Sequence, residues 1–248
     1  MFILSLLFFV TAILYSSVGF GGGSTYLALL LIWDIPYYIF PVIALFCNVI
    51  VVSGNSINYI KAGNFNSSLL SPFLIGSVPL SFIGGTIILE KEIFEIILFL
   101  VLSFAGLMLL INSNSYKENN FELKRISKLN SIIIGSLLGF ISGIVGIGGG
   151  IFLSPILFLL KVGYPKQIAT TASLFILINS ISGIFGQFTK QNILNNVLEF
   201  WPLFVVVLVG GLTGNFLNIK FLSSRILTII TSVLVIFVAI RIGLQIIT

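Results

Sequence analysis

Eight long apolar stretches dominate the sequence, and short polar segments separate them. They cover residues 2–33, 36–59, 68–89, 93–112, 129–161, 166–189, 197–219 and 224–247. A helix needs about 20 apolar residues to cross the hydrocarbon core of a bilayer. Only 8% of the residues are charged, whereas an average soluble domain has about 25%. The pattern predicts an all-α integral membrane protein that crosses the lipid bilayer several times.

Two of these stretches, residues 2–33 and 129–161, are too long for a single crossing. At ~1.5 Å per residue each would extend about 50 Å as one helix, whereas the hydrocarbon core is ~30 Å thick. Both have three successive glycines near the middle, at residues 21–23 and 148–150. Each glycine costs ~1 kcal/mol relative to alanine inside a helix. We therefore expect each long stretch to be a broken helix.

The composition excludes several classes of function. Histidine is absent and Cys47 is the only cysteine, which excludes zinc hydrolases and histidine-based triads. We therefore expect no metal, no cofactor and no enzymatic activity. The net charge of +5 comes without a basic cluster, so no nucleic acid is expected as a partner.

The two halves of the chain are copies of each other. Val-Gly-Phe-Gly-Gly-Gly at residues 18–23 matches Val-Gly-Ile-Gly-Gly-Gly at residues 145–150. At one constant offset, Pro36, Ile39, Leu45, Phe46, Ser53, Gly54, Lys61 and Asn66 recur as Pro165, Ile168, Leu174, Phe175, Ser182, Gly183, Lys190 and Asn195. These matches divide the chain into a first membrane repeat (1–112), a polar cytoplasmic linker (113–128) and a second membrane repeat (129–248).

The relative orientation of the repeats depends on whether the broken helices cross the membrane. If each crosses it, every half has four spans, the repeats are parallel, and the 12 basic residues divide seven to five between the two sides. If each is a re-entrant hairpin, every half has the hairpin plus three transmembrane helices, and the basic residues divide nine to three. The positive-inside rule favours the second arrangement, which gives inverted repeats with both termini outside.

The glycine tips are the candidate binding site. In an inverted arrangement they enter from opposite faces, each exposing free backbone N–H groups before a new helix start, where anions bind. The next helices add hydroxyl and amide donors. The predicted substrate-binding residues are Gly21, Gly22, Gly23, Ser24, Asn48, Gly148, Gly149, Gly150, Thr170, Thr171, Ser173 and Asn179.

Structural roles explain some of the same residues. Glycines in membrane helices also permit close helix packing, although two copies inside over-long stretches favour a site. Asn48 and Asn179 could pair between helices or contact a ligand, and the sequence leaves both roles open.

The paired Val-Gly-x-Gly-Gly-Gly segments, each followed by an apolar half-helix and a proline, resemble the sulfite exporter TauE/SafE family of membrane permeases. The run Ala-Thr-Thr-Ala-Ser-Leu at residues 169–174 and the lysines that close the next spans, Lys61 and Lys190, share this resemblance. In the first half that run is replaced by Phe-Pro-Val-Ile-Ala at residues 40–44.

The resemblance implies a secondary transporter in the bacterial cytoplasmic membrane that exports sulfite or a related small sulfur anion, such as a sulfonate or thiosulfate. Alternating access is the expected mechanism. The alternative is an ion channel with a glycine-backbone filter. Such a filter needs four segments around an axis and this chain supplies two, so a channel would require a homodimer. For the transporter, the sequence leaves both a monomer and a homodimer open.

Overall fold

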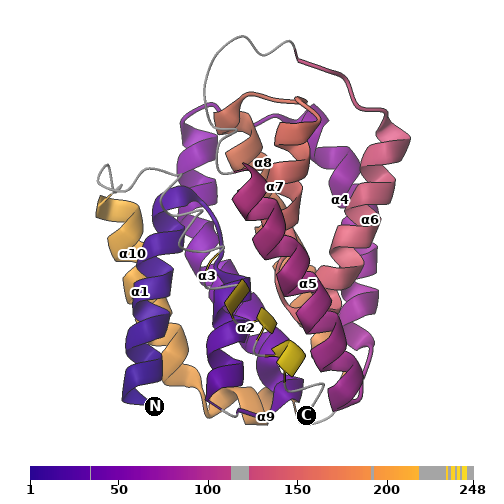
Figure 1. Cartoon of the computed structure of the whole chain (residues 1–248). Helices are drawn as coiled ribbons and strands as arrows, with labels where there is room; N and C mark the ends of the chain where they lie inside the picture. The colour runs from indigo at the N-terminus through magenta and orange to yellow at the C-terminus, as the bar shows by residue number, and fades with distance from the viewer. Residues whose placement is uncertain are drawn as a thin grey trace.

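The computed structural model describes residues 1–33, 35–112, 123–190 and 193–217, together with positions 233, 236–237, 239–240 and 242–244. Every regular element in these ranges is a helix (Figure 1). The helices are α1 (Phe2–Val18), α2 (Gly23–Ile32), the 3-10 helix η1 (Tyr37–Ile39), α3 (Phe40–Lys61), α4 (Ser67–Thr86), α5 (Lys91–Asn112), α6 (Lys128–Val145), α7 (Gly150–Leu159), α8 (Pro165–Gln187), α9 (Ile193–Leu198) and α10 (Trp201–Leu217). Most of the predicted linker (113–122) and most of the last predicted span (224–247) lie outside the described residues.

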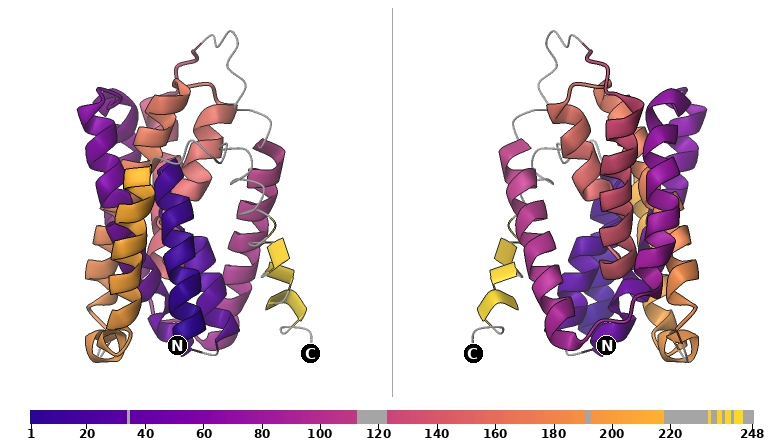
Figure 2. Two further views of the ribbon diagram at one scale, coloured as in Figure 1. Left: turned by 90° about the vertical axis from the view of Figure 1, so that its left-hand side faces the viewer. Right: turned by 90° about the vertical axis from the view of Figure 1, so that its right-hand side faces the viewer.

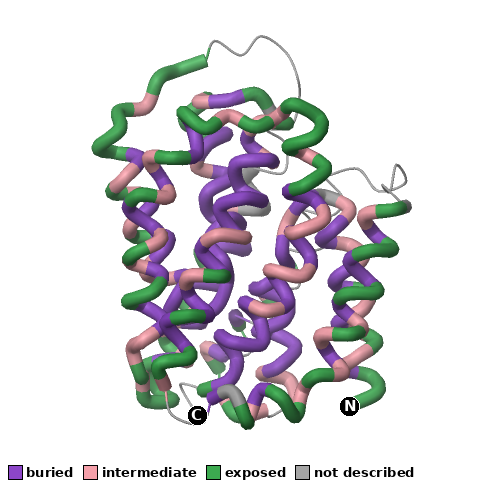
Figure 3. Tube along the Cα trace, turned by 180° about the vertical axis from the view of Figure 1, so that it is seen from behind, coloured by how far each residue is buried: buried purple, intermediate pink, exposed green. Residues whose placement is uncertain are grey.

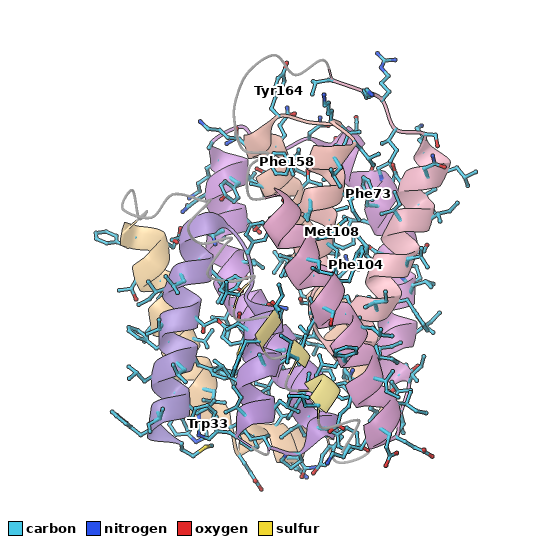
Figure 4. All side chains as sticks on the ribbon, viewed as in Figure 1. Trp33, Phe73, Phe104, Met108, Phe158 and Tyr164 are labelled. Atoms are coloured by element: carbon cyan, nitrogen blue, oxygen red, sulfur yellow. The ribbon has the colours of Figure 1, made fainter. Side chains whose placement is uncertain are left out.

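Within the described ranges, four helices are long and apolar enough to cross a membrane, at Tyr37–Lys61, Ser67–Thr86, Lys128–Val145 and Lys166–Gln187. They confirm the prediction of a multi-pass helical membrane protein. Trp33 and Tyr164 lie at opposite ends of the bundle (Figure 4), as is typical of aromatic residues at the two membrane interfaces. Buried residues concentrate in the helices at the centre, and exposed apolar residues cover the flanks (Figure 3).

Both over-long stretches are broken at the predicted glycines. α1 ends at Val18 and α6 at Val145, and the glycines that follow them, Gly19 and Gly146, have φ of 84° and 91° in the left-handed region that glycine adopts without strain. α2 and α7 begin after Gly22 and Gly149, whose φ values are 84° and 73°. Each second helix has only 10 residues, or about 15 Å, which is half the hydrocarbon core.

Each pair of helices folds back as a hairpin. α2 returns to the lower end of Figure 1, from which α1 started, and α7 returns to the upper end, from which α6 started. The first hairpin is therefore α1–α2, the second is α6–α7, and the two open at opposite ends of the molecule. α3 and α8, which follow them, run in opposite directions through the centre.

The helices form two groups that meet along α3 and α8. α1 packs along α10, and α2 and α10 pack on α3; these four are the first helix group (Figure 2). α6 packs along α4, and α4 and α7 pack on α8; these four are the second helix group. The first helix of each hairpin thus packs on a helix from the other half of the chain. α5 lies beside α7, with the rings of Phe104 and Phe152 6.0 Å apart.

Glycines set the distance between α4 and α6. Gly135, Gly139 and Gly143, spaced by four residues on one face of α6, lie against the carbonyl oxygens of Phe73, Ser77 and Ser81. A Cβ atom at Gly139 would lie 2.6 Å from the Cα of Ser77. Such backbone-to-backbone contact is typical of membrane helices held together by small residues, so α4 and α6 form one closely packed unit.

We expect Gly139→Ala to destabilise this unit. The added methyl meets backbone that cannot move aside, and overpacking of this kind lowers the melting temperature by about 5 °C or more. Gly211→Ala is the matched control, because its Cβ would lie 3.6 Å from the nearest atom, the Cα of Val51, at an ordinary contact distance. Fluorescence-detected thermal unfolding in detergent measures both. Equal melting temperatures for the two variants would contradict the packing argument.

Candidate functional site

The tips of the two hairpins meet at one side chain, Asn48 of α3. Asn48 is fully buried, and its Nδ2 donates hydrogen bonds to the carbonyl oxygens of Ile147 at 3.1 Å and Gly146 at 3.4 Å, both in the second tip. A Cβ atom at Gly148 would lie 2.8 Å from the same Nδ2. Asn48 therefore joins the first half of the chain to the hairpin of the second half.

The first tip lies against the same atoms. A Cβ atom at Gly23 would lie 2.8 Å from Asn48 Nδ2 and 2.8 Å from the carbonyl oxygen of Ile147, and Gly21 lies against Asn48 Oδ1. There is no room for a side chain at Gly21, Gly23 or Gly148, so glycine is required by the close approach of the two tips.

Both tips carry backbone N–H groups without acceptors. In the first tip these are the N–H groups of Gly21, Gly22, Gly23 and Ser24, and in the second those of Gly148, Gly149, Gly150 and Ile151, counting acceptors within the described ranges. The first N–H groups of a helix have no partner inside the helix, and they carry the positive end of its dipole. Two such helix starts, α2 and α7, lie at the meeting point of the tips.

Polar side-chain atoms without partners surround the tips. Among the described residues, nine buried polar side-chain atoms make no hydrogen bond, and they include Ser24 Oγ and Asn48 Oδ1 at the tips and Asn179 Oδ1 and Ser180 Oγ on α8. Ser180 Oγ would lie 3.1 Å from a Cβ atom at Gly148. Buried polar groups are nearly always hydrogen-bonded. Several buried polar atoms without partners close together therefore indicate a site where water or a ligand binds.

Ser180 did not emerge from the sequence. Its counterpart at the constant offset between the repeats is Val51, so comparison of the two halves gave no signal there. In the sequence, Ser180 is marked only by its position next to Asn179 within the apolar stretch 166–189.

The other predicted tip glycines face their own half of the chain. Gly22 lies 3.2 Å from the rings of Tyr15 and Tyr26, measured from the position of its Cβ. Gly149 and Gly150 face Phe175 and Ile176 on α8, at 2.9 Å for the Phe175 Cε1 atom. These three glycines shape the tips, whereas Gly21, Gly23 and Gly148 form the contact between them.

The predicted donors on α8 divide into two places. Thr170, Thr171 and Ser173 lie seven to ten residues before Ser180, or about 10 to 15 Å along the helix. Thr170 Oγ1 donates to the carbonyl oxygen of its own helix at Lys166, at 2.7 Å, and Thr171 Oγ1 is unpaired among the described residues. Ser173 Oγ forms a hydrogen bond with Ser56 Oγ of α3, at 3.0 Å.

Asn48 and Asn179, which the repeat makes near counterparts, have different contacts. Asn48 Nδ2 binds the opposite hairpin, whereas Asn179 Nδ2 donates to the carbonyl oxygen of Phe175 in its own helix, at 2.9 Å. Each amide uses its NH2 group for structure and leaves Oδ1 without a partner.

The site contains no charged side chain. Residues 2–33, 35–60, 129–160 and 167–189, which build the tips and the central helices, include no Asp, Glu, Lys or Arg. The described residues contain no cluster of metal-ligating side chains either. The electrostatic field at the tips comes from backbone N–H groups, helix dipoles and neutral polar side chains.

Comparison with known proteins agrees with this architecture. Residues 4–242 match the family model described as sulfite exporter TauE/SafE. The chain is 29% identical over 232 residues to a probable membrane transporter protein of Sinorhizobium fredii, with 93% of each chain covered. It is 30% identical over 205 residues to a probable membrane transporter protein of Methanocaldococcus jannaschii, covering 74% of this chain and 70% of that one.

A probable membrane transporter protein of Bacillus subtilis is 25% identical over 247 residues, with 89% of each chain covered. No solved structure matches the chain. The family match spans nearly the whole sequence, and the relatives are named as probable membrane transporter proteins. The chain belongs to the sulfite exporter TauE/SafE family of multi-pass membrane transporters.

Proposed function

We propose that this protein is a secondary transporter that exports sulfite or a related small sulfur anion and binds it between the two hairpin tips. The observation that carries the proposal is the meeting of the tips at Asn48, with unpaired N–H groups from two helix starts. Helix N-termini bind anions, and paired half-helices at a repeat interface are the usual site of secondary transporters. The name of the family supports a sulfur oxyanion as the substrate.

The two halves of the chain act as inverted repeats in this proposal. Corresponding helices run in opposite directions, α1 against α6 and α3 against α8, and the hairpins open at opposite ends. Each hairpin then provides access to the anion from one side of the membrane.

The distribution of basic residues supports the orientation. The described basic residues at the upper end of Figure 1 are Lys61, Lys124, Arg125, Lys128, Lys161 and Lys166, and those at the lower end are Lys91 and Lys190. The positive-inside rule makes the upper end cytoplasmic. An exported negative charge gains ~2.3 kcal/mol per 100 mV from a cytoplasm-negative potential, so efflux requires no coupling ion.

We assign the movement to the two helix groups. Because α1 packs along α10 and α6 along α4, neither hairpin can swing free of the helix that it contacts. The first and second helix groups rock against each other along α3 and α8, and the tips open first to one side and then to the other. In this form of alternating access, each hairpin moves together with the helices on which it packs.

Flux in proteoliposomes tests the proposal. We expect saturable efflux of sulfite, thiosulfate or a small sulfonate from vesicles with an imposed membrane potential, and no efflux from protein-free vesicles. Potassium leak is recorded in the same vesicles. Potassium conductance without anion efflux would mean that the tips present carbonyl oxygens to a cation, and it would overturn the proposal in favour of a channel.

A further inference from the structure

Lys190 lies just beyond the end of α8, at the lower end of the bundle. Its Nζ donates a hydrogen bond to Gln187 Oε1 at 2.7 Å. Gln187 is fully buried, and its Nε2 donates to the carbonyl oxygen of Gly143 at 2.9 Å. Gly143 is three residues before Gly146, where the second tip begins. A polar chain therefore leads from Lys190 to the base of the second tip.

The Lys190 ammonium has no counter-ion among the described residues. Their salt bridges include only the pair Lys91–Glu95, and the hydrogen bond from Lys190 goes to a neutral amide. α4 and α10 carry no charged residue, and the charges of α3, α6 and α8, Lys61, Lys128 and Lys166, lie at the other end. Lys190 is half-buried, and partial burial of an ammonium without a carboxylate costs free energy that a bound anion would offset.

The other charged groups that the structure describes at the lower end form no salt bridge with Lys190. They are Glu90, Lys91, Glu92 and Glu95 around the start of α5, and Glu199 after α9. Asp34, between α2 and η1 in the sequence, lies outside the described residues. Partial burial lowers the pKa of Lys190 to about 8, and no charged group in the described ranges opposes that effect.

We propose that Lys190 binds the transported anion at the outer end of its path across the membrane. Lys190 lies ten residues after Ser180, or about 15 Å further along the axis of α8. The inference rests on the proposed function, because it assigns a second position to the same anion. Lys190 supplies the cation that the tips lack. A sulfur oxyanion therefore exchanges between the neutral donors at the hairpin tips and the ammonium of Lys190 at the outer end of the protein. Glu and Asp are absent from its contacts in the described chain, which leaves the ammonium free to bind an external or departing anion.

The pH dependence follows from the charge of Lys190. The ammonium is present below pH 8 and is lost as the pH rises through the pKa, so anion binding weakens at high pH. For thiosulfate, whose charge does not change in this range, we expect the KM of native transport to rise about tenfold between pH 7 and pH 9. Maximal flux should change less than about twofold, because the tips are untouched.

Two substitutions separate charge from structure. Lys190→Gln should raise the KM for thiosulfate at pH 7 by about tenfold and remove its pH dependence. Lys190→Arg should keep the native KM at pH 7 and hold it constant to pH 9, because arginine stays protonated. An unchanged KM in Lys190→Gln, or an equal rise of KM with pH in Lys190→Arg, would overturn the proposal.

Chemical labelling gives a readout that does not require transport. Purified full-length protein is treated with acetic anhydride at pH 8, with and without thiosulfate, and acetylation is measured by mass spectrometry. We expect thiosulfate to slow acetylation of Lys190 by at least about threefold relative to Lys91, an exposed lysine at the same end, whereas an equal ionic strength of chloride does not. Equal labelling with and without thiosulfate would refute binding at Lys190, whatever the flux assay shows.

Discussion

The Gly23→Ala variant is expected to fold normally and to lose transport by about a hundredfold, because small misplacements at a binding site have effects of that size. Its single added methyl would lie 2.8 Å from both Asn48 Nδ2 and the carbonyl oxygen of Ile147. Real Cβ atoms do not approach other atoms so closely, so the two tips must move apart. Gly23 is the first residue of α2, without the left-handed φ of Gly22, so the backbone itself accepts alanine.

The measurement is thiosulfate or sulfite efflux from proteoliposomes together with the melting temperature of the same preparation. Gly211→Ala is the control for an added methyl at a buried position of a helix, because its Cβ would lie at ordinary contact distance from Val51 and would not contact the tip residues. We expect native flux in the control. A Gly23→Ala protein with native flux would show that contact between the tips is not needed for transport. A large fall in its melting temperature would show that the tips serve the fold instead.

The elements of this fold could be predicted from the sequence because hydropathy and glycine act locally. The spans predicted at residues 36–59 and 68–89 are α3 and α4 within a few residues of their ends. The predicted breaks occur at Gly19–Gly22 and Gly146–Gly149, where the backbone adopts a left-handed conformation that other residues avoid. Both features are decided within a few neighbouring residues.

The contacts between elements could not be predicted, since they depend on which faces meet. Asn48 and Ile147 are 99 residues apart, and no local pattern tells that an amide on α3 reaches the second tip. The sequence also grouped Thr170 and Thr171 with the tips. The second tip lies along α8 from Ala172, whose carbonyl oxygen would be 2.8 Å from a Cβ atom at Gly150, to Ser180, about 12 Å further along the helix. Residue type suggested a donor in each case, but only the register of α8 against the tips decides which donor lies there.

The pairing of the helices also could not be predicted from the sequence. The matching sequence motifs do not indicate that α1 packs on α10 or that α6 packs on α4. In both cases the first helix of a hairpin packs on a helix from the other half of the chain. The reason is steric: Gly210 and Gly214 of α10 lie against the backbone of Phe9 and Ile13, as the glycines of α6 lie against α4. Each helix group therefore contains helices from both halves of the chain, and we expect movement at the boundary between the groups.

A disulfide between α3 and α8 should stop that movement. Ser56 Oγ and Ser173 Oγ are 3.0 Å apart, and both side chains are buried where the two helix groups meet. Sulfur atoms at these positions need to move together by only about 1 Å to reach the bond length of a disulfide. Cys47 is buried and is the only native cysteine, so Cys47→Ala gives a clean background for the pair Ser56→Cys and Ser173→Cys.

In that background the protein is oxidised with iodine and freed of iodine before the anion is added. We then expect anion efflux of the double variant to fall to less than about a tenth, because separation of the helix groups is blocked. Dithiothreitol should restore the flux, and each single variant should be insensitive to iodine. Mass spectrometry of the unreacted thiols gives the fraction that is cross-linked. Full transport by a completely cross-linked protein would show that α3 and α8 stay together at Ser56 and Ser173 throughout the cycle. The hairpins alone would then have to move, against the close backbone packing of Gly139 on Ser77.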